Sequence, residues 1–227
     1  MNIGVVGLSH HTASLEVRER FALDATATTR VLARALAAGP REAVVLSTCN
    51  RTELYWASQA EPQAQAAGLI GILAAEAAFP ADAASEYCYL HTGGGAARHL
   101  FRVAASLDSL VVGEAQIQGQ VRDAYRQAAS AALEPKPVGP TLARLFEMAL
   151  AVGGRVRSET ALGTGAGSIP SAAVELARKV FGSLKGRRAL IVGAGEMSEL
   201  AGVCLREAGV SAIAVASRGE ARAHGRG

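Results

Sequence analysis

The stretch VVLSTCNRTELYW, residues 44–56, joins two apolar runs through a short polar segment that contains Cys49. Residues 42–47 carry the aliphatic and β-branched side chains typical of a strand, and residues 52–57 alternate as a half-buried strand does. A further strand of this type is predicted at residues 2–8. Cys49 therefore lies at a strand end, where a thiol is either a small buried packing group or a nucleophile.

The residues next to Cys49 are polar, namely Thr48, Asn50 and Arg51. They suit a core poorly and suit the binding of a charged, hydrogen-bonding substrate well. A cation beside a thiol lowers the pKa of that thiol towards the reactive thiolate. Alternatively, the Arg51 guanidinium binds a substrate carboxylate through two parallel hydrogen bonds, which a lysine does less well.

The regions on either side alternate between strand and helix patterns. Helices are predicted at residues 26–39 and 61–79, a strand at 86–92, and mostly helix from 95 to about 160, with Asp108 and Ser109 interrupting one helix. This order predicts an N-terminal α/β domain of about 150 residues, which is a common domain size. We place it at residues 1–158.

A change of pattern follows near residue 160. A glycine-rich linker at 161–171 leads to a helix at 171–184, and residues 187–218 read as strand, glycine turn, helix and strand in immediate succession. This is the beginning of a Rossmann-type fold, so residues 159–227 are predicted to form the first part of an NADP-binding domain.

The glycine turn contains Gly193 and Gly195, directly after an apolar strand and directly before a helix. Such glycines let backbone amides approach a pyrophosphate at the helix N-terminus. Ser198 takes the place of the third glycine of the motif. The next strand ends at Ser217 and Arg218, where an arginine suits a 2′-phosphate and favours NADP over NAD. The alternative is a nucleotide-free α/β unit in which these glycines only turn the chain.

Composition narrows the class of protein. The chain has 227 residues, 50% hydrophobic and 19% charged, with a formal net charge of +3, which permits a nucleic-acid partner without arguing for one. The cysteines, Cys49, Cys88 and Cys204, are odd in number and far apart, so no disulfide framework is expected. We expect neither a signal peptide nor a membrane span, and therefore a reducing cytoplasmic location.

The sequence leaves the roles of two histidines, His99 and His91, undecided. His99 lies beside the apolar stripe of a predicted helix, so it is either a solvated helix-face residue or a catalytic one. Cys88 and His91 have the spacing of two metal ligands, but no second pair completes a zinc site.

Several motifs in this order resemble the glutamyl-tRNA reductase family: GLSHHTASLEVRE, VVLSTCNRTELY, HLFRVAASLDSLVVGEAQIQGQVRDAY, GSIPSAAVELA and LIVGAGEMSELA. The resemblance covers residues 3 to about 218. It implies NADPH-dependent reduction of glutamyl-tRNA(Glu) to glutamate-1-semialdehyde, the first step of the five-carbon route to 5-aminolevulinate and tetrapyrroles. The partners it implies are glutamyl-tRNA(Glu), a second copy of the chain and glutamate-1-semialdehyde aminomutase.

The resemblance also assigns site residues. Cys49 would be the nucleophile that holds a glutamyl thioester, and His99 the histidine that supports activity. Contacts with the glutamyl group would come from Thr48, Asn50, Arg51, Ser109, Glu114, Ala115, Gln116 and Gln120. The nucleotide site would comprise Gly193, Ala194, Gly195, Glu196, Met197 and Ser198, with Ser217 and Arg218 at the ribose. Ser106 and Ala115 stand where relatives commonly carry glycine and proline.

The chain departs from the family in length, because family members continue through the rest of the NADPH domain into a dimerisation domain. We therefore expect this chain by itself to reduce its substrate poorly or not at all. Two alternatives stay open: a reductase-deficient esterase or acyl-transfer enzyme that keeps Cys49, and a tRNA-binding module without catalysis.

Overall fold

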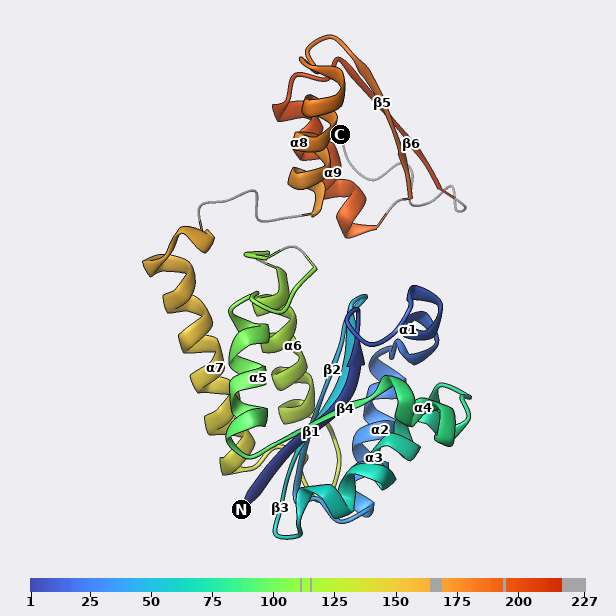
Figure 1. The fold of residues 1–227 in the computed structure, drawn as a ribbon, viewed down its shortest axis with the longest axis vertical. Coiled ribbons are helices and arrows are strands. Elements are labelled where there is room, and N and C mark those ends of the chain that lie inside the picture. Colours follow the sequence, from blue (N-terminus) through green and yellow to red (C-terminus); the bar gives the residue numbers. More distant parts are fainter. Residues whose placement is uncertain (111, 115, 164–168, 194, 218–227) are drawn as a thin grey trace. The chain divides into compact units, whose positions relative to one another are not determined.

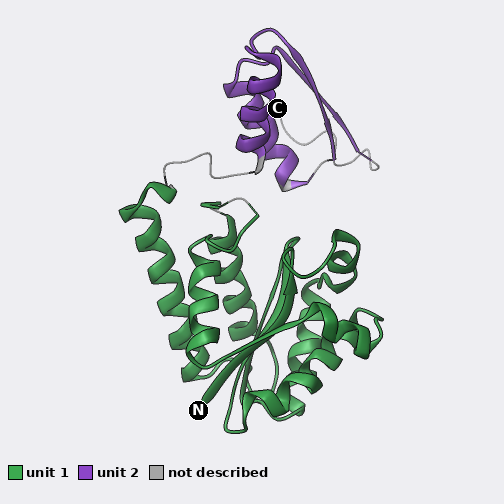
Figure 2. Cartoon of the chain, viewed as in Figure 1, with its two compact units in different colours: residues 1–163 green, residues 164–227 purple. Residues whose placement is uncertain are grey.

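The computed structural model describes residues 1–110, 112–114, 116–163, 169–193 and 195–217. The chain forms two compact units, residues 1–163 and 164–227 (Figure 2). The division falls a few residues beyond the boundary that the sequence analysis places near 160. Calls on Ala115, Ala194 and Arg218 fall outside the described residues.

Unit 1 is built on a four-stranded antiparallel sheet with the strand order β2-β3-β1-β4. The strands are β1 (Asn2–Ser9), β2 (Glu42–Ser47), β3 (Arg51–Ser58) and β4 (Tyr89–Thr92). The mixed helix-and-sheet class is as predicted, and so are these strands in outline. The fourth strand was predicted to start at residue 86, but it starts later because residues Ala81–Tyr87 form the helix α4.

Helices cover both faces of this sheet (Figure 1). On one side lie α1 (Leu15–Phe21), α2 (Ala25–Ala37), α3 (Pro62–Glu76) and α4. On the other lie α5 (Gly94–Ala104), α6 (Gln116–Ser130) and α7 (Pro140–Glu159), followed by the 3₁₀ turn η1 (Ala161–Gly163). All eight residues of β3 are buried.

Successive residues of β3 point into opposite layers, as the pleat of a strand requires. The Tyr55 ring packs edge-on against Phe146 of α7, with 5.3 Å between ring centroids. The Thr52 hydroxyl instead donates to the Phe21 carbonyl at the end of α1. Arg51, Glu53 and Tyr55 are every second residue of β3, so their side chains share one face. Both charged side chains therefore enter the layer of α5, α6 and α7.

A carboxylate from β2 caps the longest helix. Gly139 precedes α7 and offers no side chain to its first amides. Glu42, only 3% exposed, accepts instead from the backbone N–H groups of Thr141 at 3.2 Å and Leu142 at 2.6 Å. An anion at this position satisfies free amides and interacts favourably with the helix dipole.

The helical run predicted from residue 95 is interrupted earlier than expected. The helix α5 ends at Ala104, and residues 105–110 and 112–114 form loop structure rather than a short break at Asp108 and Ser109. Ser106 has φ of 58°, a left-handed conformation that favours glycine, which fits the glycine that the resemblance implies for this position.

Unit 2 contains α8 (Ile169–Phe181), β5 (Arg188–Val192), α9 (Glu196–Glu207) and β6 (Ala212–Ala216). The strands β5 and β6 pair in parallel, and α9 connects them, so the predicted strand, turn, helix and strand are confirmed. Leu190 and Val192 of β5 are exposed. Within the described residues no single helix is long and apolar enough to span a membrane; α3 and α4 satisfy the length and composition test only as a pair, bent by 108°.

Candidate functional site

Cys49 lies at the tip of the turn between β2 and β3, and its side chain is exposed. The hydroxyl of Thr48 accepts from the backbone N–H groups of Asn50 at 3.1 Å and Arg51 at 3.2 Å. The Thr48 N–H donates to the Arg51 carbonyl at 2.8 Å. The thiol is therefore presented by a hydrogen-bonded turn and is not a packing group of the core.

Neighbouring segments hold this turn in place. Nε of Arg18 donates to the Cys49 carbonyl at 3.3 Å, and its Nη1 donates to the Ala13 carbonyl at 2.7 Å. The His10 N–H, just beyond β1, donates to the Asn50 carbonyl at 2.9 Å. The position of the thiol thus depends on α1 and β1 as well as on the turn itself.

Arg51 is buried, with 1% of its surface exposed, although the sequence analysis expected it to act on the thiol or to bind a substrate carboxylate. Its Nη1 lies 2.8 Å from Oε1 of Glu53 and 3.1 Å from Oδ2 of Asp108, and its Nη2 donates to the Asp108 carbonyl. Burial by itself would lower the pKa of Arg51, but Glu53 outweighs that effect and raises the pKa above its usual range. The guanidinium joins the strand to the loop after α5.

Glu53, which the sequence analysis did not single out, accepts hydrogen bonds from four side chains. Its Oε1 accepts from Arg51, from the Tyr89 hydroxyl at 2.5 Å and from Nε2 of His99 at 2.8 Å, while Oε2 accepts from the Tyr55 hydroxyl at 2.5 Å. Its side chain is fully buried. Burial alone would raise the pKa of this carboxyl, but Arg51 and His99 hold it well below its usual range.

The space for this carboxylate is made by a glycine. Gly7 of β1 pairs with Glu53 on one side and with Tyr89 of β4 on the other. A Cβ at Gly7 would lie 2.4 Å from the Thr52 carbonyl oxygen and 2.9 Å from Cγ of Glu53. The absent side chain lets the Tyr89 hydroxyl reach across β1. A signal was present in the sequence, since a strand that alternates Arg51, Glu53 and Tyr55 with Leu54 and Trp56 carries charge on one face.

His99 is buried, which neither of the readings from the sequence anticipated. Besides Glu53, its ring contacts those of His91, at a centroid distance of 4.8 Å, and Tyr89, at 5.3 Å. Burial, and next the neighbouring His99, lower the pKa of His91. Through Glu53, His99 belongs to the same hydrogen-bond network as Arg51.

The Cys49 thiol does not have the lowered pKa expected from a cationic neighbour. Desolvation and then the charge of Glu114 raise its pKa, whereas its own backbone hydrogen bond and Arg18 act in the opposite direction. The expectation that Arg51 lowers the pKa of Cys49 was wrong, because the Arg51 guanidinium is bound by Glu53 and Asp108. Desolvation also raises the pKa of Glu114, which is 8% exposed.

The loop after α5 carries other predicted site residues towards this turn. Asp108 lies on Arg51, and the half-buried Ser109 follows it. Glu114, at the other end of the loop, interacts electrostatically with Cys49 and raises the pKa of its thiol. Gln116 begins α6, and Gln120 lies one turn later in a separate polar recess that also involves Ser47.

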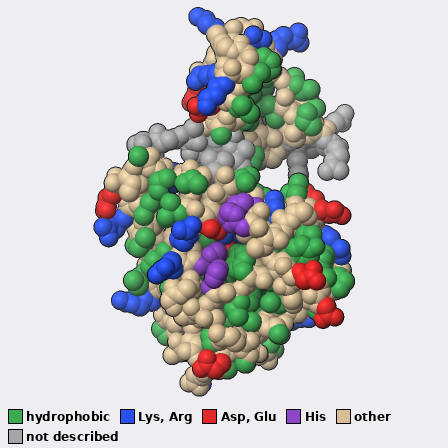
Figure 3. Space-filling view, in the orientation of Figure 1, with side chains coloured by type: hydrophobic (Ala, Val, Ile, Leu, Met, Phe, Trp, Pro, Cys, Tyr) green, Lys and Arg blue, Asp and Glu red, His purple; other side chains and the backbone are tan. Residues whose placement is uncertain are grey.

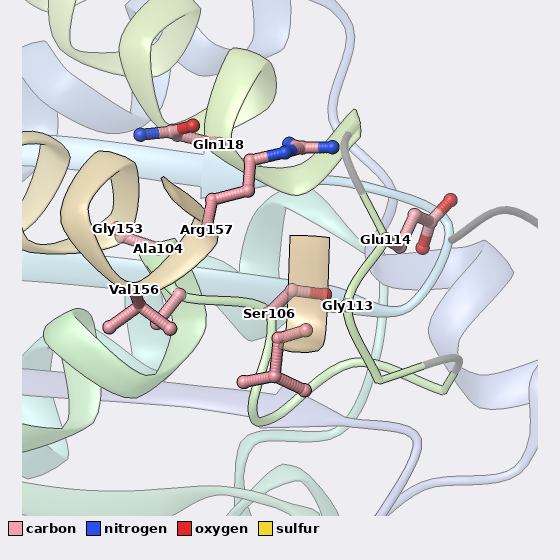
Figure 4. A pocket seen from close by; sticks show the side chains of 10 residues that line it. Ala104, Ser106, Gly113, Glu114, Gln118, Gly153, Val156 and Arg157 are labelled. Carbon is pink, nitrogen blue, oxygen red and sulfur yellow. The ribbon is translucent and has the colours of Figure 1, made fainter. Parts of the chain in front are cut away.

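A small recess lies between this loop and the helices α6 and α7, lined by Ser106, Gly113, Glu114, Gln118 and Arg157 among others (Figure 4). Gln118, which was not predicted, donates to the Leu150 carbonyl at 2.9 Å and so joins α6 to α7. Cys49 does not line this recess. Figure 3 shows histidine side chains at the surface of unit 1 among basic and acidic side chains.

In unit 2 the glycine turn follows β5 as predicted. Gly193 has φ of 119°, and a Cβ there would lie 3.2 Å from Oγ of Ser198. Gly195 is the N-cap of α9 and leaves the first amides of the helix without a side-chain cap. These amides fit a phosphate. Met197 and Ser198 are half-buried, and Ser217, which follows β6, is exposed. The Glu196 side chain lies outside the described part of the structure.

A family model for the N-terminal domain of glutamyl-tRNA(Glu) reductase matches residues 6–160. The chain belongs to the glutamyl-tRNA reductase family. A second model, for shikimate/quinate 5-dehydrogenase, matches residues 175–225. That match supports a Rossmann-type fragment and suggests a nicotinamide cofactor.

Individual relatives agree. Glutamyl-tRNA reductase of Rubrobacter xylanophilus is 51% identical over 98% of this chain and 51% of its own length, and that of Syntrophotalea carbinolica is 45% identical over 98% and 49%. The solved glutamyl-tRNA reductase from Methanopyrus kandleri superposes with a TM-score of 0.61 at 34% identity, covering 97% of this chain and 50% of that one. The chain spans about half the length of the reductases it matches.

Membership in this reductase family directs attention to unit 1. There the structure brings Cys49 and its turn together with Arg51, Glu114 and, through Glu53, His99. Gln120 lines the separate recess instead. No group of three or more His, Cys, Asp or Glu side chains suited to a metal ion occurs among the described residues.

Proposed function

We propose that this chain performs the acyl-transfer chemistry of glutamyl-tRNA reduction, with Cys49 as the nucleophile. The observation that carries the proposal is the exposed thiol on a hydrogen-bonded turn, two residues before an arginine buried in the same network as His99. Family membership supports glutamyl-tRNA(Glu) as the substrate.

In the proposed step the sulfur of Cys49 attacks the carbonyl carbon of the glutamyl ester. A carbon–sulfur bond forms, the bond from that carbon to the ribose oxygen of tRNA breaks, and the thiol proton ends on the released ribose hydroxyl. The products are a glutamyl thioester on the enzyme and free tRNA. A thiolate is the reactive form, and covalent capture divides one difficult reaction into two easier ones.

Residues around the thiol have distinct proposed roles. Thr48 and Asn50 of the turn, together with Ser109, Glu114, Gln116 and, by family resemblance, Ala115 and Gln120, would contact the glutamyl group. Two nitrogens of Arg51 already bind Glu53 and Asp108. Its Nε is buried and has no hydrogen-bond partner among the described residues, so a substrate oxygen that reaches this buried atom would satisfy it.

The second half of the proposed reaction uses NADPH held by unit 2. Gly193, Gly195 and the uncapped amides of α9 would hold the pyrophosphate, and Ser217 and Arg218 would hold the 2′-phosphate. When bound, NADPH supplies the hydride that converts the thioester into glutamate-1-semialdehyde and frees the thiol.

A second function, ester hydrolysis without reduction, is favoured by one observation. The Cys49 side chain is exposed, so water can reach a thioester formed on it. Attack of water on that thioester would release free glutamate and regenerate the thiol.

A single-turnover experiment tests both functions. The purified chain is mixed with glutamyl-tRNA(Glu) radiolabelled in glutamate, with and without NADPH, and quenched in acid. We expect hydroxylamine-sensitive label on the wild-type protein and on Cys88→Ser, and none on Cys49→Ser. Semialdehyde formed only with NADPH identifies the reductase, whereas free glutamate in both samples identifies the esterase. Absence of any label on the wild-type protein would refute the role of Cys49.

A further inference from the structure

The fully buried Glu53 carboxylate does not touch solvent, yet two of its hydrogen-bond donors, Arg51 and His99, belong to the proposed site. Its four donors come from β3, β4 and α5. A buried ion pair contributes little net stability compared with apolar residues of the same volume. A fully satisfied buried network does, however, fix the orientation of its members.

Glu53 connects the two parts of the site that the sequence keeps apart. Through Arg51 it reaches Asp108 and the loop after α5, and the Arg51 backbone itself closes the turn that presents Cys49. Through the hydrogen bond at 2.8 Å it reaches His99 on α5. One carboxylate oxygen, Oε1, therefore sets the relative positions of Arg51 and His99.

The chemistry of this oxygen also decides the protonation of the histidine. An ionised carboxylate only accepts hydrogen bonds, and Arg51, Tyr55 and Tyr89 are all donors to it. The proton in the contact with His99 must therefore sit on Nε2. In the neutral ring this leaves Nδ1 as the basic nitrogen, and a carboxylate partner is a common means of fixing a histidine tautomer.

We propose that Glu53 is a positioning residue for the acyl transfer at Cys49: it holds His99 in the tautomer protonated at Nε2 and holds Arg51 against Asp108. This inference rests on the proposed function for its catalytic consequence, but the tautomer is a property of the chain without substrate. Glu53 itself touches neither thiol nor substrate.

The decisive variant is Glu53→Gln. The amide has the shape of the carboxylate, but its NH₂ group is a donor and cannot accept hydrogen bonds from the donors around it. We expect the rate of Cys49 acylation under single-turnover conditions to fall about ten- to a hundred-fold, with the affinity for glutamyl-tRNA little changed. Nitrogen-15 NMR of the histidines should show His99 protonated at Nε2 in the wild-type protein and a mixture of tautomers in the variant. Glu53→Asp keeps the charge and should keep the tautomer while it slows acylation.

Glu42→Gln is the matched control, because Glu42 is also a buried carboxylate of the same sheet, but it caps α7. We expect it to lower the melting temperature without changing the acylation rate per folded molecule or the His99 tautomer. Wild-type acylation in Glu53→Gln, equal rate losses in both variants, or a wild-type His99 protonated at Nδ1 would each overturn the proposal. A wild-type chain that forms no thioester would refute the proposed function, and the tautomer measurement would still test the arrangement around Glu53.

Discussion

Arg51 and Asp108 are 57 residues apart in sequence and meet through two groups of the aspartate. Nη1 of Arg51 lies 3.1 Å from the carboxylate oxygen Oδ2, and Nη2 donates to the backbone carbonyl of Asp108. The same Nη1 lies 2.8 Å from Glu53. A planar guanidinium makes these contacts in parallel, whereas a lysine has one nitrogen to divide among them.

The first prediction follows from this geometry. Arg51→Lys keeps the charge but leaves acceptors of Glu53 and Asp108 without a donor in a buried site. We expect the free energy of unfolding to fall by about 2 kcal/mol, measured by urea denaturation. Acylation of Cys49 should slow as well, because the loop after α5 loses its connection to the turn.

An exposed arginine provides the control for this variant. Arg30 pairs with Glu76 on the surface, with 57% of its side chain exposed. Solvent screens such a pair, so Arg30→Lys should leave the urea midpoint unchanged. Equal shifts of the midpoint in the two variants would show that the buried geometry of Arg51 has no particular importance.

The second prediction concerns Gly7, which separates Glu53 from Tyr89 across β1. In Gly7→Ala the new Cβ would lie 2.4 Å from a backbone oxygen, which cannot move away as a flexible side chain can. We expect a loss of about 2 kcal/mol in unfolding free energy. Gly68→Ala in α3, where nothing lies within 4 Å, should instead stabilise by about 0.5 to 1 kcal/mol. An unchanged free energy of unfolding in Gly7→Ala would contradict the close packing of β1 against β3.

Local pattern was sufficient to predict much of this fold. The strands β1, β2 and β3 and the strand–turn–helix–strand of unit 2 follow from periodicity and glycine placement, which act over a few residues. The helix α4 was missed because it is only seven residues long and its last residues overlap a strand-like sequence that begins at Glu86. Antiparallel pairing could not be read from the alternation of strands and helices, because pairing is decided by contacts between distant segments.

The site was predictable in its residue types but not in their contacts. The polar neighbours of Cys49 favoured a reactive role, the family resemblance assigned it as the nucleophile, and its exposure agrees with that role. Arg51 was expected to face a substrate, yet its charge is matched by Glu53 and Asp108 inside the domain. The sequence could not predict the pairing of Arg51 with Asp108, because Asp108 lies in a loop 57 residues further along the chain.

The third prediction is a dependence of stability on acid. Folding lowers the pKa of Glu53, so its contribution to stability is complete above the unfolded-state pKa, near 4.5, and is lost as the pH falls below that value. Urea unfolding between pH 7 and pH 3 should show a steeper loss for the wild-type protein than for Glu53→Gln. Parallel curves would mean that this carboxylate is protonated as easily in the folded state as in the unfolded one.

The last prediction concerns the thiol itself. Desolvation and then Glu114 raise the pKa of Cys49 from its ordinary value, so alkylation by iodoacetamide should keep accelerating as the pH rises into the alkaline range. Glu114→Gln removes the second of these influences and should increase the rate at pH 8 by about two- to five-fold.

Cys88 provides an internal reference for this measurement, because burial raises its pKa to about 11 without any contribution from Glu114. Peptide mapping of one labelled sample gives both rates, and only their ratio at pH 8 should respond to Glu114→Gln. An unchanged ratio would remove Glu114 from the surroundings of the thiol. A rate for Cys49 that is already maximal below pH 7 would show a thiolate stabilised by a cation, and Arg18 would then be the residue to change, because Arg51 is held by Glu53 and Asp108.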